Sequence, residues 1–119
     1  MNHLILEWLK KLRSGDYKKG TDHLKSYSQY KCLEYCTFGV LADVLVAHGY
    51  GYWGGVNKCT FFCELPLLSS EGSEEQLPTK LLMLLGLDNT VVADLVDAND
   101  NYDSSFSEIA DKIEDWFSD

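Results

Sequence analysis

The sequence predicts a mainly α-helical protein, a compact bundle of about five helices with a short β-hairpin near residues 52–65. Three observations support this prediction. The length of 119 residues fits one domain, so residues 1–119 are expected to form a single globular domain. Apolar residues make up 45% of the chain, which is enough to build a core and argues against disorder. Their spacing follows the helical period over most of the sequence.

The N-terminal segment has apolar residues at the i, i+3, i+4, i+7 spacing of one helix face. These residues are Leu4, Ile5, Trp8, Leu9 and Leu12. Gly15 is expected to end this first helix. Residues 16–30 are mostly polar, and they predict a turn with a short helix.

The middle of the chain predicts a central helix followed by the hairpin. Residues 35–48 are apolar on nearly every side of a helix, interrupted by Asp43, so this helix is expected to be buried. Four glycines between residues 49 and 55 break it. Residues 58–65, rich in Phe and Thr, predict a strand or hairpin that must pack on the helices to persist.

The C-terminal half predicts a loop and three helices. Residues 69–76 form the loop, and Pro78 opens a helix that ends before Gly86. Residues 87–98 form the next helix. The last helix is expected to bury its apolar stripe, which comprises Phe106, Ile109, Ala110, Ile113 and Phe117.

Charge is distributed unevenly along the chain. The net charge is −9, but residues 1–31 carry seven basic and three acidic side chains, so the remainder carries −13. Such asymmetry suggests two faces with different partners, although a solvated surface without partners is the favoured explanation. The acidic balance disfavours direct DNA binding. The chain lacks the apolar run of a signal peptide or a membrane span, so we expect a cytoplasmic protein with no membrane contact.

Four cysteines suggest two kinds of thiol chemistry, and burial in the core is a simpler alternative to both. Cys32 and Cys36, and likewise Cys59 and Cys63, are four residues apart, and four thiolates could bind zinc. Alternatively, Cys36 could be a nucleophile at the start of the central helix, although no histidine is placed as its base. Burial as small apolar residues is the favoured interpretation, and no cofactor is expected.

An EF-hand calcium loop is a further candidate site. Oxygen-bearing side chains follow the ligand spacing of such a loop; they are Asp97, Asn99, Asn101, Asp103, Ser105 and Glu108. The sixth position should be glycine but is Tyr102. A capping box formed by Ser105 and Glu108 at the start of the last helix explains the pattern without a metal, and we favour it.

The ligand or partner site is expected around one buried carboxylate and one aromatic loop. Asp43 should pair with a cation or cap backbone donors, and we predict Arg13 as its partner. This pair would fix the first helix to the central one or line a pocket with Tyr17. The loop offers aromatic rings for stacking or for a protein contact; they are Tyr50, Tyr52 and Trp53.

Several motifs resemble a family of small uncharacterised accessory proteins of bacteriophages and prophages. Trp8 precedes Leu-Arg-Ser-Gly-Asp-Tyr at residues 12–17, and Tyr-Cys-Thr-Phe-Gly-Val-Leu-Ala-Asp spans residues 35–43. Asn-Asp at residues 99–100 precedes Phe-Ser-Glu-Ile-Ala-Asp at residues 106–111. Thr37 and Ala42 stand where this family usually has cysteine, so the resemblance implies no shared thiol chemistry. It implies an accessory role in the cytoplasm of an infected bacterium, commonly interference with host defence.

Three functions follow, in order of preference. The first is a non-catalytic inhibitor that binds a host defence effector or nuclease through its acidic C-terminal half. The second is sequestration of a small nucleotide immune signal by the aromatic loop and the basic N-terminal third, at an interface of a homo-oligomer. The third is an enzyme that degrades such a signal, which ranks last because no catalytic constellation is specific.

Overall fold

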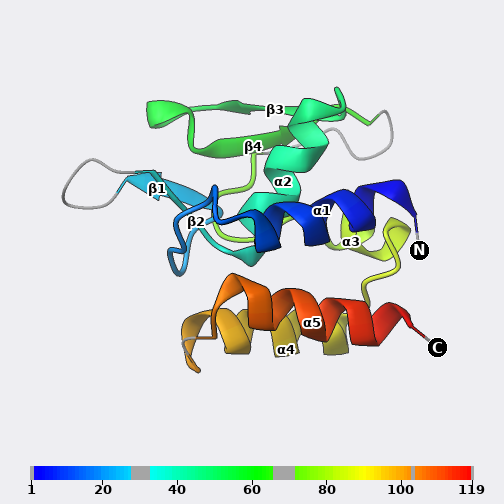
Figure 1. Ribbon diagram of the computed structural model, residues 1–119. Coiled ribbons are helices and arrows are strands. Elements are labelled where there is room, and N and C mark those ends of the chain that lie inside the picture. Colours follow the sequence, from blue (N-terminus) through cyan, green and yellow to red (C-terminus); the bar gives the residue numbers. More distant parts are fainter. Residues whose placement is uncertain (1, 28–32, 66–71, 103, 119) are drawn as a thin grey trace.

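The computed structural model describes residues 2–27, 33–65, 72–102 and 104–118, and within these ranges it contains five α-helices and two antiparallel strand pairs (Figure 1). The helices are α1 (His3–Ser14), α2 (Thr37–Ala47), α3 (Thr79–Leu84), α4 (Asn89–Asp100) and α5 (Phe106–Phe117). Strand β1 (Lys25–Tyr27) pairs with β2 (Leu33–Tyr35), and β3 (Gly51–Gly54) pairs with β4 (Thr60–Cys63) around the 3-10 turn η1 (Val56–Lys58). The prediction of a mainly α fold with a hairpin near residues 52–65 is confirmed.

Helix α1 ends at the predicted Gly15, and Asn2 caps its start. The Asn2 side chain accepts a hydrogen bond from the Ile5 backbone N–H at 2.9 Å, and Gly15 ends the helix in the left-handed region at φ 81°. The apolar face of α1 is buried against α2 and α5. Trp8 is fully buried, and its indole Nε1 donates to the Thr37 carbonyl oxygen at 2.9 Å, which fixes α1 to the first turn of α2.

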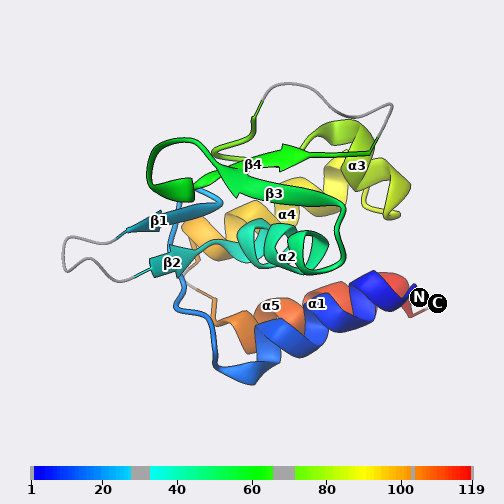
Figure 2. The ribbon, with the colours of Figure 1, turned by 90° about the horizontal axis from the view of Figure 1, so that it is seen from above.

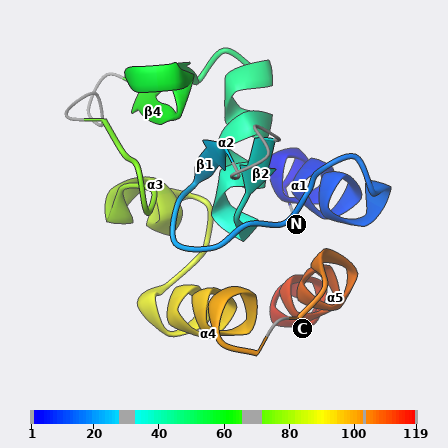
Figure 3. The ribbon, with the colours of Figure 1, turned by 90° about the vertical axis from the view of Figure 1, so that its left-hand side faces the viewer.

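The molecule has three layers with α2 in the middle. Figure 1 shows the β3–β4 hairpin above, α4 and α5 below, and α2 with α1 and α3 between them. The β1–β2 pair and α3 lie at opposite ends of the molecule (Figures 1 and 2). Seen from the end, α4 and α5 lie side by side, with α1 over α5 (Figure 3). The central position predicted for residues 35–48 is therefore confirmed.

The β1–β2 pair corrects the prediction for residues 16–30. Its described part, residues 16–27, contains no helix and ends in β1, and Tyr35, predicted to be helical, ends β2. The strands are three residues long and show no alternation of burial. They are held by distant backbone contacts, such as the Leu24 N–H to the Glu74 oxygen at 2.7 Å and the Cys36 N–H to the Leu24 oxygen at 3.2 Å. Local sequence carries no signal for such contacts.

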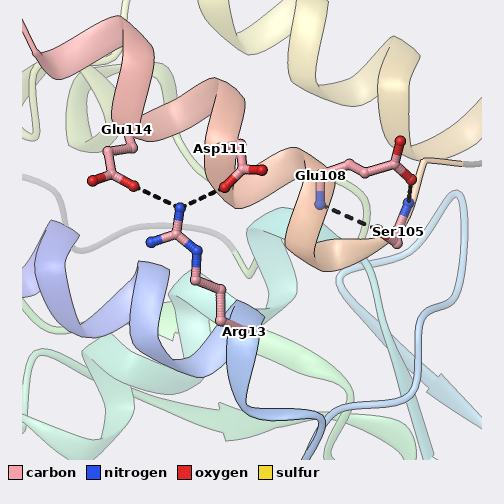
Figure 4. A network of polar contacts seen from close by, with 5 residues as sticks. All are labelled: Arg13, Ser105, Glu108, Asp111 and Glu114. Carbon is pink, nitrogen blue, oxygen red and sulfur yellow. Dashed lines mark hydrogen bonds and ion pairs between the residues drawn. The ribbon is translucent and has the colours of Figure 1, made fainter.

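The C-terminal helices follow their predicted boundaries closely. Gly86 follows α3 at φ +85°, and the Asp88 side chain caps α4 by accepting from the Val91 N–H at 3.0 Å. Ser105 and Glu108 form the predicted capping box of α5 (Figure 4). Part of the predicted loop at residues 69–76 lies outside the described residues. In the described part of the chain, no helix has the length and apolarity that crossing a membrane requires.

Candidate functional site

Arg13 does not pair with Asp43, so that prediction is wrong. Its Nη2 donates to Asp111 Oδ1 at 2.7 Å and to Glu114 Oε1 at 2.6 Å, and both carboxylates belong to α5 (Figure 4). These hydrogen bonds raise the pKa of Arg13 above its ordinary value. Arg13 therefore fixes α1 to α5 rather than to α2, and its charge is already compensated.

Asp43 instead accepts hydrogen bonds from two neutral aromatic side chains. The Tyr17 hydroxyl donates to Oδ2 at 2.5 Å, and Trp53 Nε1 donates to Oδ1 at 3.0 Å. The prediction failed because it required a cation beside a buried charge, whereas Asp43 is only half-buried and two neutral donors suffice. The Asp43 cluster, defined as Tyr17, Tyr35, Asp43 and Trp53, thus joins the segment after α1 to α2 and β3.

Burial keeps both tyrosines of the Asp43 cluster protonated. It raises the pKa of Tyr17 above its usual value, and the hydrogen bond to Asp43 adds to the effect. Burial also raises the pKa of Tyr35 to about 12. The two rings pack edge to face at 4.9 Å between centroids. We interpret the cluster as a structural connection, because each Asp43 oxygen already has a donor.

The three aromatic residues of the predicted loop do not form one stacking platform. Tyr52 and Trp53 are consecutive in β3, so their side chains point to opposite faces. Tyr52 stacks on Phe62, Trp53 packs against Phe61, and Tyr50 stacks on His48. The sequence analysis also missed Lys25, whose Nζ lies 4.8 Å from the centroid of the Trp53 ring.

The cysteines do not assemble a zinc site or an activated thiol in the described part of the chain. Cys63 lies in β4 and Cys59 precedes it, and an extended segment keeps residues four apart too distant to chelate one ion. Cys32 lies outside the described residues. Burial raises the pKa of Cys36 to about 11, partly offset by the backbone N–H groups of Phe38 and Gly39, so its thiol is protonated at neutral pH.

The capping box favoured over an EF-hand loop is present, and α4 continues through Asp100, so it includes two of the six candidate ligands, Asp97 and Asn99. Asn99 points inward and is 2% exposed; its Oδ1 accepts from Thr37 N at 3.1 Å and Thr37 Oγ1 at 2.8 Å, and its Nδ2 donates to the Gly20 oxygen at 3.0 Å. Asn101 donates to Asp97, and Glu108 caps α5. Asp103 lies outside the described residues. Across the described ranges, no three or more His, Cys, Asp or Glu side chains are placed to hold a metal ion.

A pocket of about 460 Å³ lies at the start of α2. Its lining comprises Asp22, Cys36, Thr37, Phe38, Glu75, Gln76, Val96, Asn99 and Asp100. The charged groups in this lining are all carboxylates. A phosphate group would be repelled here.

A larger and more open groove lies along α4, beside Trp116 of α5. We call it the α4 groove; its volume is about 710 Å³, and it is lined by Thr90, Val91, Ala93, Asp94, Val96, Asp97, Asn101 and Trp116. Trp116 comes from α5, is 41% exposed, and donates from Nε1 to the Gly86 oxygen at 3.3 Å. The sequence analysis missed this residue, although its place beside Ile113 and Phe117, at the edge of the apolar stripe of α5, could have indicated it.

These features define a small, mainly α-helical domain whose buried polar clusters connect its elements and whose open groove is partly acidic. The chain matches, over residues 1–117, the model of a family described as a domain of unknown function (DUF8296), and it belongs to that family. A search of curated proteins and a search of solved structures each found no match.

Proposed function

We propose that this protein binds and inhibits a basic host protein, as an accessory protein of a phage would in countering host defence. The observation that supports this proposal is the charge of α4 and α5. Residues 88–119 contain ten acidic side chains and one basic one, Lys112. We define the acidic face as the exposed or half-buried carboxylates of α4, α5 and the preceding cap that lie outside both the Arg13 contact and the pocket at the start of α2: Asp88, Asp94, Asp97, Glu108 and Asp115.

The two helices that carry the acidic face lie side by side at one side of the molecule (Figure 3). Carboxylates gathered on one side create a negative potential that attracts a positively charged partner and speeds its association. Arg13 offsets Asp111 and Glu114 on the neighbouring side, where α5 packs on α1. The uncompensated charge is therefore concentrated away from α1.

Sequestration of a nucleotide receives less support. That alternative counted Arg13, with Lys18 and Lys19, among the cations that would hold the phosphates, but Arg13 is engaged by two carboxylates of α5. The aromatic rings of the loop point to different neighbours, and the pocket at the start of α2 is acidic. An enzyme dependent on Cys36 also receives less support, because the thiol is protonated at neutral pH.

Affinity capture at two salt concentrations tests the proposal. The wild-type chain, immobilised and exposed to bacterial lysate, should retain a basic protein at low ionic strength and release it at high ionic strength. The variant Asp94→Asn/Asp97→Asn/Asp115→Asn should retain less of it. The matched control Asp16→Asn/Glu64→Gln/Glu75→Gln removes three exposed carboxylates elsewhere and should retain the wild-type amount.

Phage plating tests the inhibitory part of the proposal. Wild-type protein, expressed in bacterial strains that each carry one defence system, should restore plaque formation in at least one strain. The acidic-face variant should lose this effect and the matched control should keep it. The proposal is overturned if plaque formation is restored in no strain, or if both variants behave alike.

A further inference from the structure

We propose that the α4 groove is the docking site for one basic amphipathic segment of the partner, with Trp116 as its apolar anchor. This inference rests on the proposed function. It assigns partner binding to one groove of the acidic face and specifies the kind of segment that binds there. The occupant carries Lys or Arg side chains on one side and large apolar side chains on the other.

The composition of the groove favours such a segment over a simple polycation. Val91, Ala93 and Val96 supply an apolar lining, and Asp94 and Asp97 lie along the same helix. A Lys or Arg side chain has an aliphatic stem and a charged end, so it can satisfy both kinds of surface at once.

Trp116 has the properties of an interface anchor. Its ring is 41% exposed, but its Nε1 donates to the Gly86 oxygen, which restrains the ring before any partner arrives. A restrained aromatic ring loses little conformational entropy on binding. Its face can contact an apolar side chain or a guanidinium group, and tryptophan is enriched among residues that dominate binding energy.

Exposed apolar side chains continue beyond the groove at the end of α3. Met83 is 63% exposed and Leu84 is 70% exposed, and both lie within three residues of Gly86, to which Trp116 is bonded. The end of α3 and the C-terminal end of α5 lie at the same end of the molecule (Figure 1). Large apolar side chains at this end favour an amphipathic occupant.

The carboxylates of the groove are weakly engaged within the chain. Lys112 Nζ lies 3.8 Å from Asp94 Oδ2, and both side chains are about half exposed or more, so this pair contributes little and a partner cation can replace it. Asp97 accepts from the neutral Asn101 side chain, which leaves its charge uncompensated by that contact. A second copy of this chain is disfavoured as the occupant, because each copy carries a net charge of −9.

A synthetic peptide tests the assignment directly. The probe is an amphipathic helical peptide of Lys and Leu, and its control is a peptide of Glu and Leu with the same length and pattern. Titration calorimetry should show binding of the first peptide only. Trp116→Ala and Asp94→Asn/Asp97→Asn should each weaken binding about tenfold or more. The control Asp16→Asn/Glu64→Gln changes net charge equally and should keep wild-type affinity.

Amide and indole chemical shifts provide a measurement that does not depend on variants. The Lys and Leu peptide should shift the Trp116 indole N–H signal and the amides of Thr90, Ala93 and Asp97 more than those of the Asp43 cluster.

Circular dichroism checks that Trp116→Ala remains folded, and Trp116→Phe, which keeps an aromatic ring, should bind better than Trp116→Ala. Equal weakening in the two double variants, or shifts spread over the whole surface, would overturn the groove assignment.

The groove and the function can fail separately. If the peptide does not bind at the groove but capture and plating still depend on the acidic face, the groove assignment is wrong and the proposed function stands. If the peptide binds at the groove but plaque formation is restored in no strain, the proposed inhibition is wrong and the docking site stands.

Discussion

At the residue scale, two polar side chains that the sequence analysis considered as ligand or metal sites instead connect elements of the fold. Asp43 accepts from Tyr17 and Trp53, and Asn99 accepts from Thr37 and donates to Gly20. Each connects segments distant in sequence. A sequence pattern shows that a polar residue lies among apolar ones, but it does not show which donors the fold brings to it.

Asn99 offers the sharpest test at this scale. Asn99→Ala should lower the free energy of unfolding by about 2–4 kcal/mol, because the Thr37 hydroxyl and N–H and the Gly20 carbonyl lose a buried partner. Asn101→Ala, at the exposed residue that follows the same helix, should change it by about 0.5 kcal/mol or less. Urea unfolding measures both. Equal losses in the two variants would show that Asn99 has no special role.

At the element scale, the sequence predicted the helices well and the short strands unevenly. Period and caps indicated α1, α4 and α5, because helix signals repeat within a few residues. The β3–β4 hairpin was also predicted, since residues 58–65 are rich in Phe and Thr and follow a glycine-rich break. The β1–β2 pair was missed because its strands depend on Leu24 contacts with Glu74 and Cys36.

The candidate site was predicted only in part. Tyr17, Asp43 and Trp53 do meet, but Arg13 lies against α5 instead. Which carboxylate Arg13 contacts depends on how the helices pack against one another, and local sequence does not specify this packing. Trp116 was overlooked because it lies beside the predicted apolar stripe of α5 and not in it, and only the packing of that helix shows its partial exposure and its contact with Gly86.

Gly39 shows how one residue permits a contact between elements. A Cβ atom at this position would lie 1.7 Å from the Leu24 carbonyl oxygen and 2.6 Å from its carbon, and backbone atoms cannot rotate away. Gly39→Ala should therefore lower the free energy of unfolding by about 3 kcal/mol or more, by displacing β1 from α2.

Gly15 provides the matched control for Gly39. A Cβ atom there would meet nothing within 4 Å, although the backbone has φ +81°. Gly15→Ala should cost only about 1 kcal/mol, the strain of an L-residue in the left-handed region. Chemical denaturation of both variants measures the difference. A loss for Gly39→Ala no larger than that for Gly15→Ala would contradict the proposed close approach.

At the scale of the whole molecule, the charges of α5 fall into two groups. Carboxylates that face α1 are paired with Arg13, whereas the acidic face of α4 and α5 is accessible to a partner. Arg13 joins the basic N-terminal helix to α5 through surface ion pairs with Asp111 and Glu114. On α4 and α5, acidic side chains also occupy the last turns, which contain no basic residue. A carboxylate near the C-terminus of a helix is unfavourable, because the helix dipole is negative there. Such placement supports selection for binding rather than for stability.

Two charge reversals with opposite expected effects test this interpretation. Asp115→Lys places a cation in the last turn of α5, and it should raise the free energy of unfolding by about 0.5 kcal/mol at low salt. Asp88→Lys makes the same change of charge at the cap of α4, and it should lower stability by about 1 kcal/mol, because the Val91 N–H loses its acceptor. Thermal unfolding at low and high salt separates the contributions, since salt should reduce the gain from Asp115→Lys and leave most of the capping loss. If both reversals shifted stability in the same direction, net charge rather than its placement would govern the fold, and the acidic last turns would no longer support selection for a partner.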